Sequence, residues 1–125
     1  IKDPGTYRLT APLTLTNLHT IKINGRSQLD AVIDGSGVTR LLELRQAQDV
    51  ELKNIVLQNG MSDESSQGGG SGGALLIDGS SNIELEGVHV ATSTSAVSGG
   101  AVVVFESSRV TFDGCVFTGN RAANA

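Results

Sequence analysis

Large aromatic rings are scarce in this sequence. Of its 125 residues none is Trp, one is Tyr and three are Phe, so no readable face offers the stacking platforms that nucleic-acid bases or sugar rings use. Charged residues are also few and sum to −4, so the basic stripe of a nucleic-acid-binding domain is missing. We therefore predict no nucleic-acid partner.

Two further scarcities narrow the class of protein. No apolar run approaches the ~20 residues that a membrane-spanning helix needs, so no membrane span is predicted. The single cysteine, Cys115, has no partner for an internal disulfide. It falls in a column of apolar positions, which predicts a small buried hydrophobic residue. Pairing with a cysteine outside these residues is the alternative.

The sequence does contain a repeat. The stretches 72–98 (GGALLIDGSSNIELEGVHVATSTSAVS) and 99–125 (GGAVVVFESSRVTFDGCVFTGNRAANA) align without a gap at a spacing of 27 residues. Within each unit apolar residues alternate with polar ones, as in Ile83-Glu84-Leu85, which is typical of a strand with one buried face. One unit therefore forms about three short strands, too little to bury its own apolar face, and it must stack on a copy of itself.

The same pattern continues toward the amino terminus at shifts of 33 and then 29 residues. It predicts two inward columns, one of Ile21, Val50, Ile83 and Val110 and one of Ile23, Leu52, Leu85 and Phe112. We predict an all-β chain, a right-handed parallel β-helix solenoid of about four coils of 27–33 residues. The coils span approximately 4–39, 40–71, 72–98 and 99–125 in one domain, and a Gly- and Ser-rich loop over 60–73 is predicted to protrude. Because no polar cap is visible at the carboxyl end, we expect the segment to belong to a longer solenoid or to meet another chain there.

These residues resemble the right-handed parallel β-helix (pectin-lyase-like) superfamily. The last two coils resemble the repeats of polymorphic outer-membrane-type cell-surface proteins, whose marks are Gly-Gly-Ala-apolar and Phe-x-x-Asn. The sequence has Gly72-Gly73-Ala74-Leu75, Gly99-Gly100-Ala101-Val102 and Phe117-Thr118-Gly119-Asn120. The third coil has Val90-Ala91-Thr92-Ser93 instead of Phe-x-x-Asn, and in the second coil Asn59 comes one residue early. In such repeats Asn120 is expected to turn inward and to satisfy backbone groups at a coil corner.

Outward-facing carboxylates are the only candidates for a metal site. Two outward columns are predicted, Lys22, Glu51, Glu84 and Thr111, and beside it Asn24, Lys53, Glu86 and Asp113. Stacked rungs lie ~4.8 Å apart, so Glu51 over Glu84 and Glu86 over Asp113 place four carboxylates on one face. Lyases of the resembled superfamily bind calcium through such acidic clusters. A solvated face with weak Lys–Glu pairs is the simpler interpretation, and we predict no cofactor, with Ca²⁺ as the alternative.

No catalytic residue is predicted. His19 and His89 lack a metal partner at ligand spacing, and the paired acids of a glycoside hydrolase are not evident. We expect a non-enzymatic structural or adhesive module of a secreted, cell-surface or appendage protein, whose partners are further coils or subunits end to end and, at the surface, glycans. The alternative is a fragment of a carbohydrate-active β-helix enzyme, a polysaccharide lyase or glycoside hydrolase, or a glycan-binding module.

Overall fold

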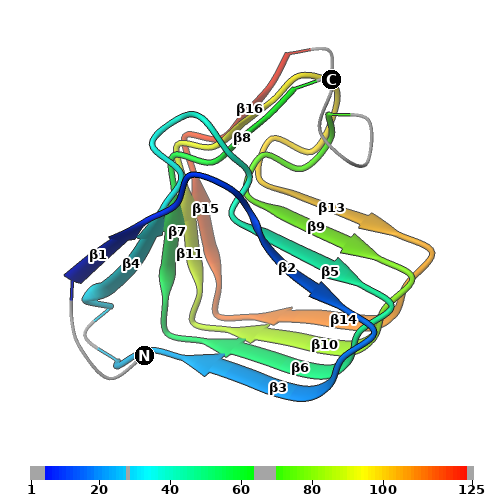
Figure 1. The fold of residues 1–125 in the computed structure, drawn as a ribbon. Coiled ribbons are helices and arrows are strands. Elements are labelled where there is room, and N and C mark those ends of the chain that lie inside the picture. Colours follow the sequence, from blue (N-terminus) through cyan, green and yellow to red (C-terminus); the bar gives the residue numbers. More distant parts are fainter. Residues whose placement is uncertain (1–4, 28, 64–69, 124–125) are drawn as a thin grey trace.

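The computed structural model of the chain describes residues 5–27, 29–63 and 70–123, and every regular element among them is a β-strand. The strands form four parallel sheets, in which consecutive coils of the chain lie side by side (Figure 1). The chain is thus a parallel β-solenoid of about four coils, as predicted.

Sheets B, C and D each take one strand from every coil that they cross, whereas sheet A takes two strands from the first coil. Sheet A consists of β1 (Gly5–Arg8), β4 (Ala31–Asp34), β7 (Val56–Gln58), β11 (His89–Ala91) and β15 (Val116–Thr118). Sheet B consists of β2 (Leu13–Thr16), β5 (Leu42–Arg45), β9 (Leu75–Asp78) and β13 (Val102–Phe105). Sheet C consists of β3 (His19–Asn24), β6 (Gln48–Lys53), β10 (Ser81–Glu86) and β14 (Ser108–Asp113). Sheet D consists of β8 (Met61–Ser62), β12 (Thr94–Ser95) and β16 (Arg121–Ala122).

The predicted register between coils is confirmed. In sheet C, Val50 pairs with Ile21 on one side and with Ile83 on the other, and Ile83 pairs with Val110. The neighbouring column pairs in the same way. It consists of Ile23, Leu52, Leu85 and Phe112. The repeat spacing read from the sequence therefore gives the stacking of the coils.

The apolar core runs along the inside of the stack, and its side chains are most fully buried in the middle coils. Leu52 and Leu85 are fully buried, whereas Phe112 at the end of the same column is 39% exposed. Each buried side chain of this size contributes roughly 1.5–3 kcal/mol relative to leaving it in water. Within the described residues, the columns are buried most completely in the two middle coils, which have a neighbouring coil on both sides.

Glycines allow the chain to return from sheet D to sheet B. A Cβ atom on Gly73 would lie 2.3 Å from the carbonyl oxygen of Gly100 and 2.6 Å from that of Thr94. The preceding Gly72 has φ +72°, a conformation that side-chain-bearing residues adopt rarely. The Gly-Gly-Ala motif thus marks a point of close backbone contact between coils.

The two described ends of the segment 60–73, which was predicted to protrude, belong to the solenoid. Met61–Ser62 form β8, which pairs with β12, and Gly60 is buried. Gly70–Gly73 are buried as well. The prediction of a loop displayed by the rod is therefore wrong for these two ends of the segment. Its middle, 64–69, lies outside the described residues.

The first coil is predicted to begin at residue 4, and its first described strand is β1, Gly5–Arg8, followed by β2 from Leu13. Residues 124–125, at the end of the predicted fourth coil, lie outside the described residues. Within the described part of the chain, no helix is long and apolar enough to cross a membrane.

Candidate functional site

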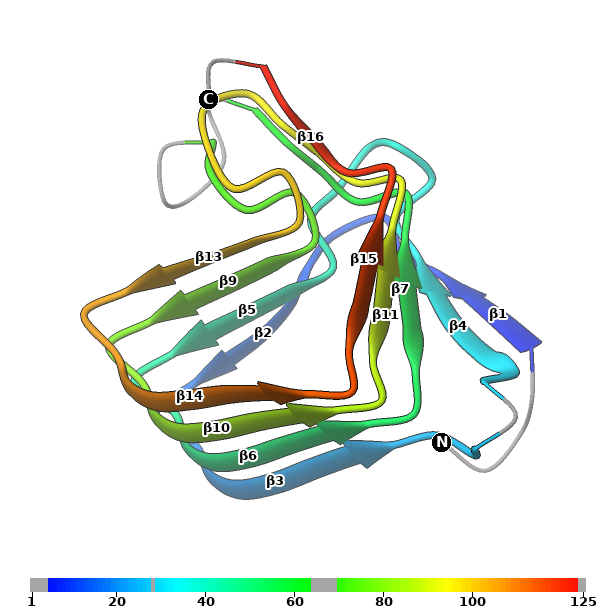
Figure 2. The same ribbon diagram turned by 180° about the vertical axis from the view of Figure 1, so that it is seen from behind.

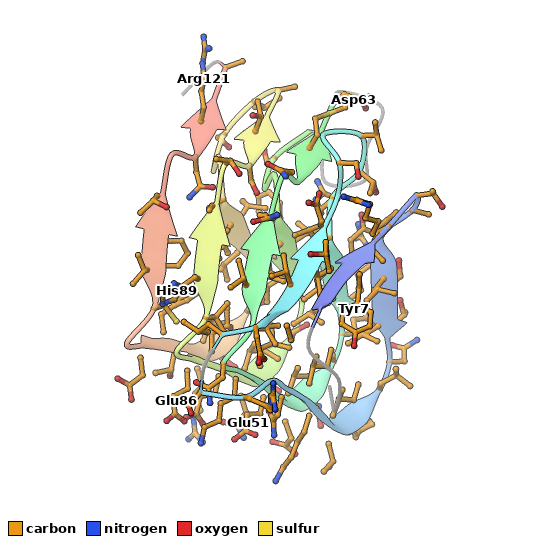
Figure 3. All side chains as sticks on the ribbon, turned by 90° about the vertical axis from the view of Figure 1, so that its left-hand side faces the viewer. Tyr7, Glu51, Asp63, Glu86, His89 and Arg121 are labelled. Atoms are coloured by element: carbon orange, nitrogen blue, oxygen red, sulfur yellow. The ribbon has the colours of Figure 1, made fainter. Side chains whose placement is uncertain are left out.

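The predicted acidic ladder lies on the outer face of sheet C. Glu51 stacks on Glu84, and Glu86 stacks on Asp113, in the predicted register. Figure 3 shows the side chains of Glu51 and Glu86 pointing away from the solenoid. The groove between the neighbouring side chains is small, about 180 Å³.

Two carboxylates on this face contact a side chain of the neighbouring coil. Lys53 Nζ lies 3.7 Å from Glu86 Oε2, and both side chains are 41% exposed. Asn82 donates a 2.6 Å hydrogen bond to Asp49. Among residues 5–27, 29–63 and 70–123, no three His, Cys, Asp or Glu side chains gather closely enough to hold a metal ion. The face thus carries carboxylates in exposed pairs, whose ionic contacts are worth little in water.

A carboxylate that the sequence analysis did not single out is buried at the corner between sheets A and D. Asp34 ends β4 and is 6% exposed. One of its oxygens accepts a 2.6 Å hydrogen bond from the Ser36 N–H, and the other accepts bonds from Gln58 Nε2 at 3.0 Å and Asn59 Nδ2 at 3.2 Å. The hydrogen bond from Gln58 is the main reason that the pKa of Asp34 lies below its ordinary value, while burial opposes the shift. Asp34 is therefore an ionised acceptor, unsuited to act as a general acid at neutral pH.

The Asp34 carboxylate connects three successive coils. The Asn59 amide that donates to it also accepts a 2.7 Å hydrogen bond from the Thr92 hydroxyl. These side chains line a groove of about 560 Å³, together with Arg8, Met61 and others. We name it the corner groove. The lining residues are Arg8, Asp34, Ser36, Gly37, Asn59, Gly60, Met61, Thr92 and Thr94. A groove with hydroxyl, amide, guanidinium and carboxylate groups can exchange hydrogen bonds with a polar ligand.

A short sequence motif indicates part of the environment of Asp34. Asp-Gly-Ser after an apolar strand is typical of a turn in which the carboxylate caps a backbone N–H two residues on, here that of Ser36. The partners Gln58 and Asn59 lie 24 and 25 residues away. They become neighbours only once the second coil is stacked.

Asn120 turns inward at the corner that follows β15. Its side-chain oxygen accepts a 3.0 Å hydrogen bond from the Ser93 N–H, and its Nδ2 donates to the Val90 carbonyl at 2.9 Å. In the third coil Ser93 stands in the same place. Its hydroxyl accepts from the Gly60 N–H at 3.1 Å and donates to the Ala91 carbonyl. Both side chains join a backbone group of the coil below to the corner, which explains how the third coil does without Phe-x-x-Asn.

An ion pair is buried on the outer face of sheet B. Arg40 Nη1 lies 2.6 Å from Glu43 Oε2, and the two side chains are 1% and 6% exposed. The same guanidinium donates to the carbonyl oxygens of Ser71 and Gly72, which lie on the return path from sheet D. Burial lowers the pKa of Arg40, and Glu43 opposes that shift. Arg40 therefore ties the second coil to the backbone that enters the third.

Cys115 and the two histidines lie apart from these networks. Cys115 is half buried, packs against the core and donates from Sγ to the Leu85 carbonyl at 3.3 Å. His89 pairs in register with Val56 and Val116 on the outside of sheet A (Figure 3). His19 is the first residue of β3.

An apolar hollow borders the last strands of the chain. Within residues 5–27, 29–63 and 70–123, β13, β14, β15 and β16 each pair with one other strand, and Figure 2 shows them at the near end of the stack. A hollow of about 650 Å³ lies there, lined by apolar residues including Val102, Val104, Phe112 and Phe117. The two Phe rings meet edge to face at 5.8 Å between centroids. Val104 and Phe117 are 40% and 44% exposed.

Comparison with known proteins adds no relative to this description. No protein-family model, no curated protein and no solved structure matches the chain. The geometry itself supports a parallel β-solenoid of about four coils.

Proposed function

We propose that the chain is a non-enzymatic structural or adhesive module, a stiff rod segment of a secreted, cell-surface or appendage protein. One observation carries the proposal: inward apolar columns pass through all the coils in register, with parallel strand pairs on every side. Such a stack supports length and rigidity, because each added coil repeats the same contacts.

Cross-coil ties add to this mechanical role. Arg40 bonds to the backbone 31 and 32 residues ahead, and Asn120 bonds to backbone groups 27 and 30 residues behind it. A force or a protease that opens one coil must therefore also break bonds to its neighbours. Opening a middle coil is costly for this reason.

Protease resistance and polysaccharide cleavage together test the proposal. A rod segment is expected to survive proteinase K at a concentration that digests a globular control of similar size, and to leave acidic polysaccharides uncut with or without Ca²⁺. Calcium-dependent cleavage that is lost in Glu84→Gln or Glu86→Gln would replace the structural role by an enzymatic one.

A glycan-binding module is the second candidate, and the corner groove is the observation that favours it. Its hydroxyl, amide and guanidinium groups are of the kind that bind sugar hydroxyls. Binding on a glycan array that Arg8→Ala and Thr94→Ala both abolish would support it. Binding that both variants leave unchanged would exclude this groove as the site.

A further inference from the structure

The corner between sheets A and D contains an Asn-Gly pair. Asn59 follows β7, and Gly60 leads into β8. Asparagine is a thermolabile residue, and it loses its amide most readily before glycine, which leaves the next backbone nitrogen unhindered. Glycine is required at position 60, since a Cβ atom there would lie 2.4 Å from the carbonyl oxygen of Gly73. The fold therefore keeps a chemically labile dipeptide beside the buried carboxylate of Asp34.

The reaction that removes the amide is internal to the chain. The Gly60 nitrogen attacks Cγ of Asn59, a bond forms between these two atoms, and the bond from Cγ to Nδ2 breaks. The Gly60 proton leaves with Nδ2 as ammonia, and a five-membered succinimide ring remains. Water then opens the ring at either carbonyl carbon, so position 59 becomes aspartate or isoaspartate. The reaction therefore needs a free Gly60 nitrogen, a mobile Asn59 side chain and water.

Both reacting groups are held by other partners in the folded chain. Asn59 Nδ2 donates to Asp34 at 3.2 Å, and Asn59 Oδ1 accepts a 2.7 Å hydrogen bond from the Thr92 hydroxyl. The Gly60 N–H donates to Ser93 Oγ at 3.1 Å. The attack requires these bonds to break, so it requires the corner to open.

A corner that has opened and reacted cannot close as before. In the aspartate product a second carboxylate replaces the amide that donates to Asp34 at 3.2 Å. Asp34 is 6% exposed, and two ionised carboxylates at this distance repel one another strongly where water is scarce. In the isoaspartate product the main chain passes through Cβ and Cγ and is longer by one atom, which displaces β8 from its register with β12. Neither product restores the native corner.

We propose that Asn59 is a deamidation site that the closed corner protects and that an opened corner converts irreversibly, with water as the co-reactant. The modification breaks the tie between the first and second coils at Asp34. The corner is thus a latch that opens in one direction only. This inference goes beyond the proposed structural role and does not depend on it.

The rate of amide loss tests the protection. The chain is incubated in mildly alkaline buffer, and the conversion at position 59 is followed by chromatography and mass spectrometry of its peptides. A synthetic peptide of residues 54–63 is the unfolded reference. The hydrogen bonds that hold the pair each shift the opening equilibrium by roughly two- to tenfold, so loss in the folded chain is expected to be at least tenfold slower than in the peptide. Thr92→Val, which removes one of these bonds, is expected to speed it by roughly two- to tenfold.

Two controls separate local opening from a general loss of stability. Thr94→Val alters an exposed threonine on the same corner and is expected to leave the rate at position 59 unchanged. Asn24-Gly25 is the second Asn-Gly pair of the sequence and lies at the end of β3. Its rate in Thr92→Val is expected to equal its rate in the wild type.

An exchange of the two side chains tests the consequence. Asn59→Asp is expected to lower the urea midpoint of unfolding. Adding Asp34→Asn is expected to restore part of the loss, because an amide at position 34 can donate to a carboxylate at position 59. Equal rates in the folded chain and the peptide, an unchanged rate in Thr92→Val, or an Asn59→Asp variant as stable as the wild type would each overturn the inference.

Discussion

The buried pair of Arg40 and Glu43 allows a quantitative test of what ties the coils together. Replacing Arg40 with Met leaves a carboxylate that is 6% exposed without its 2.6 Å partner, and it removes the donor to the Ser71 and Gly72 carbonyls. Breaking a buried pair in this way costs about 3–5 kcal/mol. That is a large share of the roughly 6–19 kcal/mol total stability of a chain of this length, at about 0.05–0.15 kcal/mol per residue.

The double replacement distinguishes a buried pair from simple packing. Glu43 lies beside the fully buried Leu76 in the next strand, so Leu at position 43 gains an apolar neighbour. Arg40→Met with Glu43→Leu removes both charges of the pair and leaves the two carbonyls without donors, at a cost of about 1–3 kcal/mol for each. Arg45, whose Nη2 lies 4.0 Å from Glu43, keeps its contact with Asp78 at 3.3 Å. The double variant is therefore expected to be more stable than Arg40→Met alone.

The assay is urea denaturation followed by far-ultraviolet circular dichroism, since the chain has no Trp for fluorescence. If the free energy of unfolding falls with urea concentration at the same slope in the variants and in the parent, the unfolding exposes the same amount of surface in each. A loss below about 1 kcal/mol for Arg40→Met, or a double variant that loses the sum of both single losses, would refute the reasoning.

Three further predictions follow from burial, hydrogen bonding and charge. Leu85→Ala is expected to lower the free energy of unfolding by about 2–5 kcal/mol. Phe112→Ala is expected to lower it clearly less, although more atoms are removed, because Phe112 is 39% exposed. Equal losses in urea denaturation would contradict a core that is buried more deeply in its middle coils. Asn120→Ala is expected to cost about 1–3 kcal/mol, because it removes the acceptor of one backbone N–H and the donor to a carbonyl; hydrogen exchange at the Ser93 amide should accelerate, and an unchanged rate would argue against the bond. The pKa of Asp34 is lowered on folding, so its contribution to stability is present above its unfolded value near ~3.9 and is lost as pH falls below it. The stability difference between wild type and Asp34→Asn should therefore shrink below pH ~4, and a difference constant down to lower pH would contradict the assignment.

The inward columns of sheet C could be predicted because their residues alternate in the sequence. Val50 and Leu52 in β6, like Ile83 and Leu85 in β10, are apolar residues separated by one polar position, and the repeat spacing then fixes which of them stack. Burial of such a face strongly specifies register, since a slip of one residue would turn every apolar side chain outward. The sequence therefore indicated both the strands of sheet C and the strands with which they pair.

Sheet D could not be found in this way, because its inward residues are small and polar. Ser62 and Ser95 face inward and are buried, and their hydroxyls donate to the carbonyls of Gly70 and Ser98, each at 2.9 Å. A strand whose inward positions are serine shows no alternation of apolar and polar residues, and in the second coil it is followed by a run of Gly and Ser. Composition alone therefore predicted a protruding loop where the backbone in fact pairs.

The stacked carboxylates of sheet C show that strand register does not determine which contacts an exposed side chain makes. The sequence predicted correctly that Glu86 stacks between Lys53 and Asp113. Register fixes only the backbone positions, however, and an exposed side chain then selects among its neighbours. Glu86 lies within an ion-pair distance of Lys53, and because both side chains are 41% exposed, their contact contributes little to stability. At Asp34 the opposite holds, because a buried carboxylate must satisfy its oxygens, and the corner supplies three donors from two coils. The stacking of whole coils therefore decides which carboxylates are buried. The buried Asp34 holds a network of hydrogen bonds, whereas the exposed Glu86 makes one weak contact.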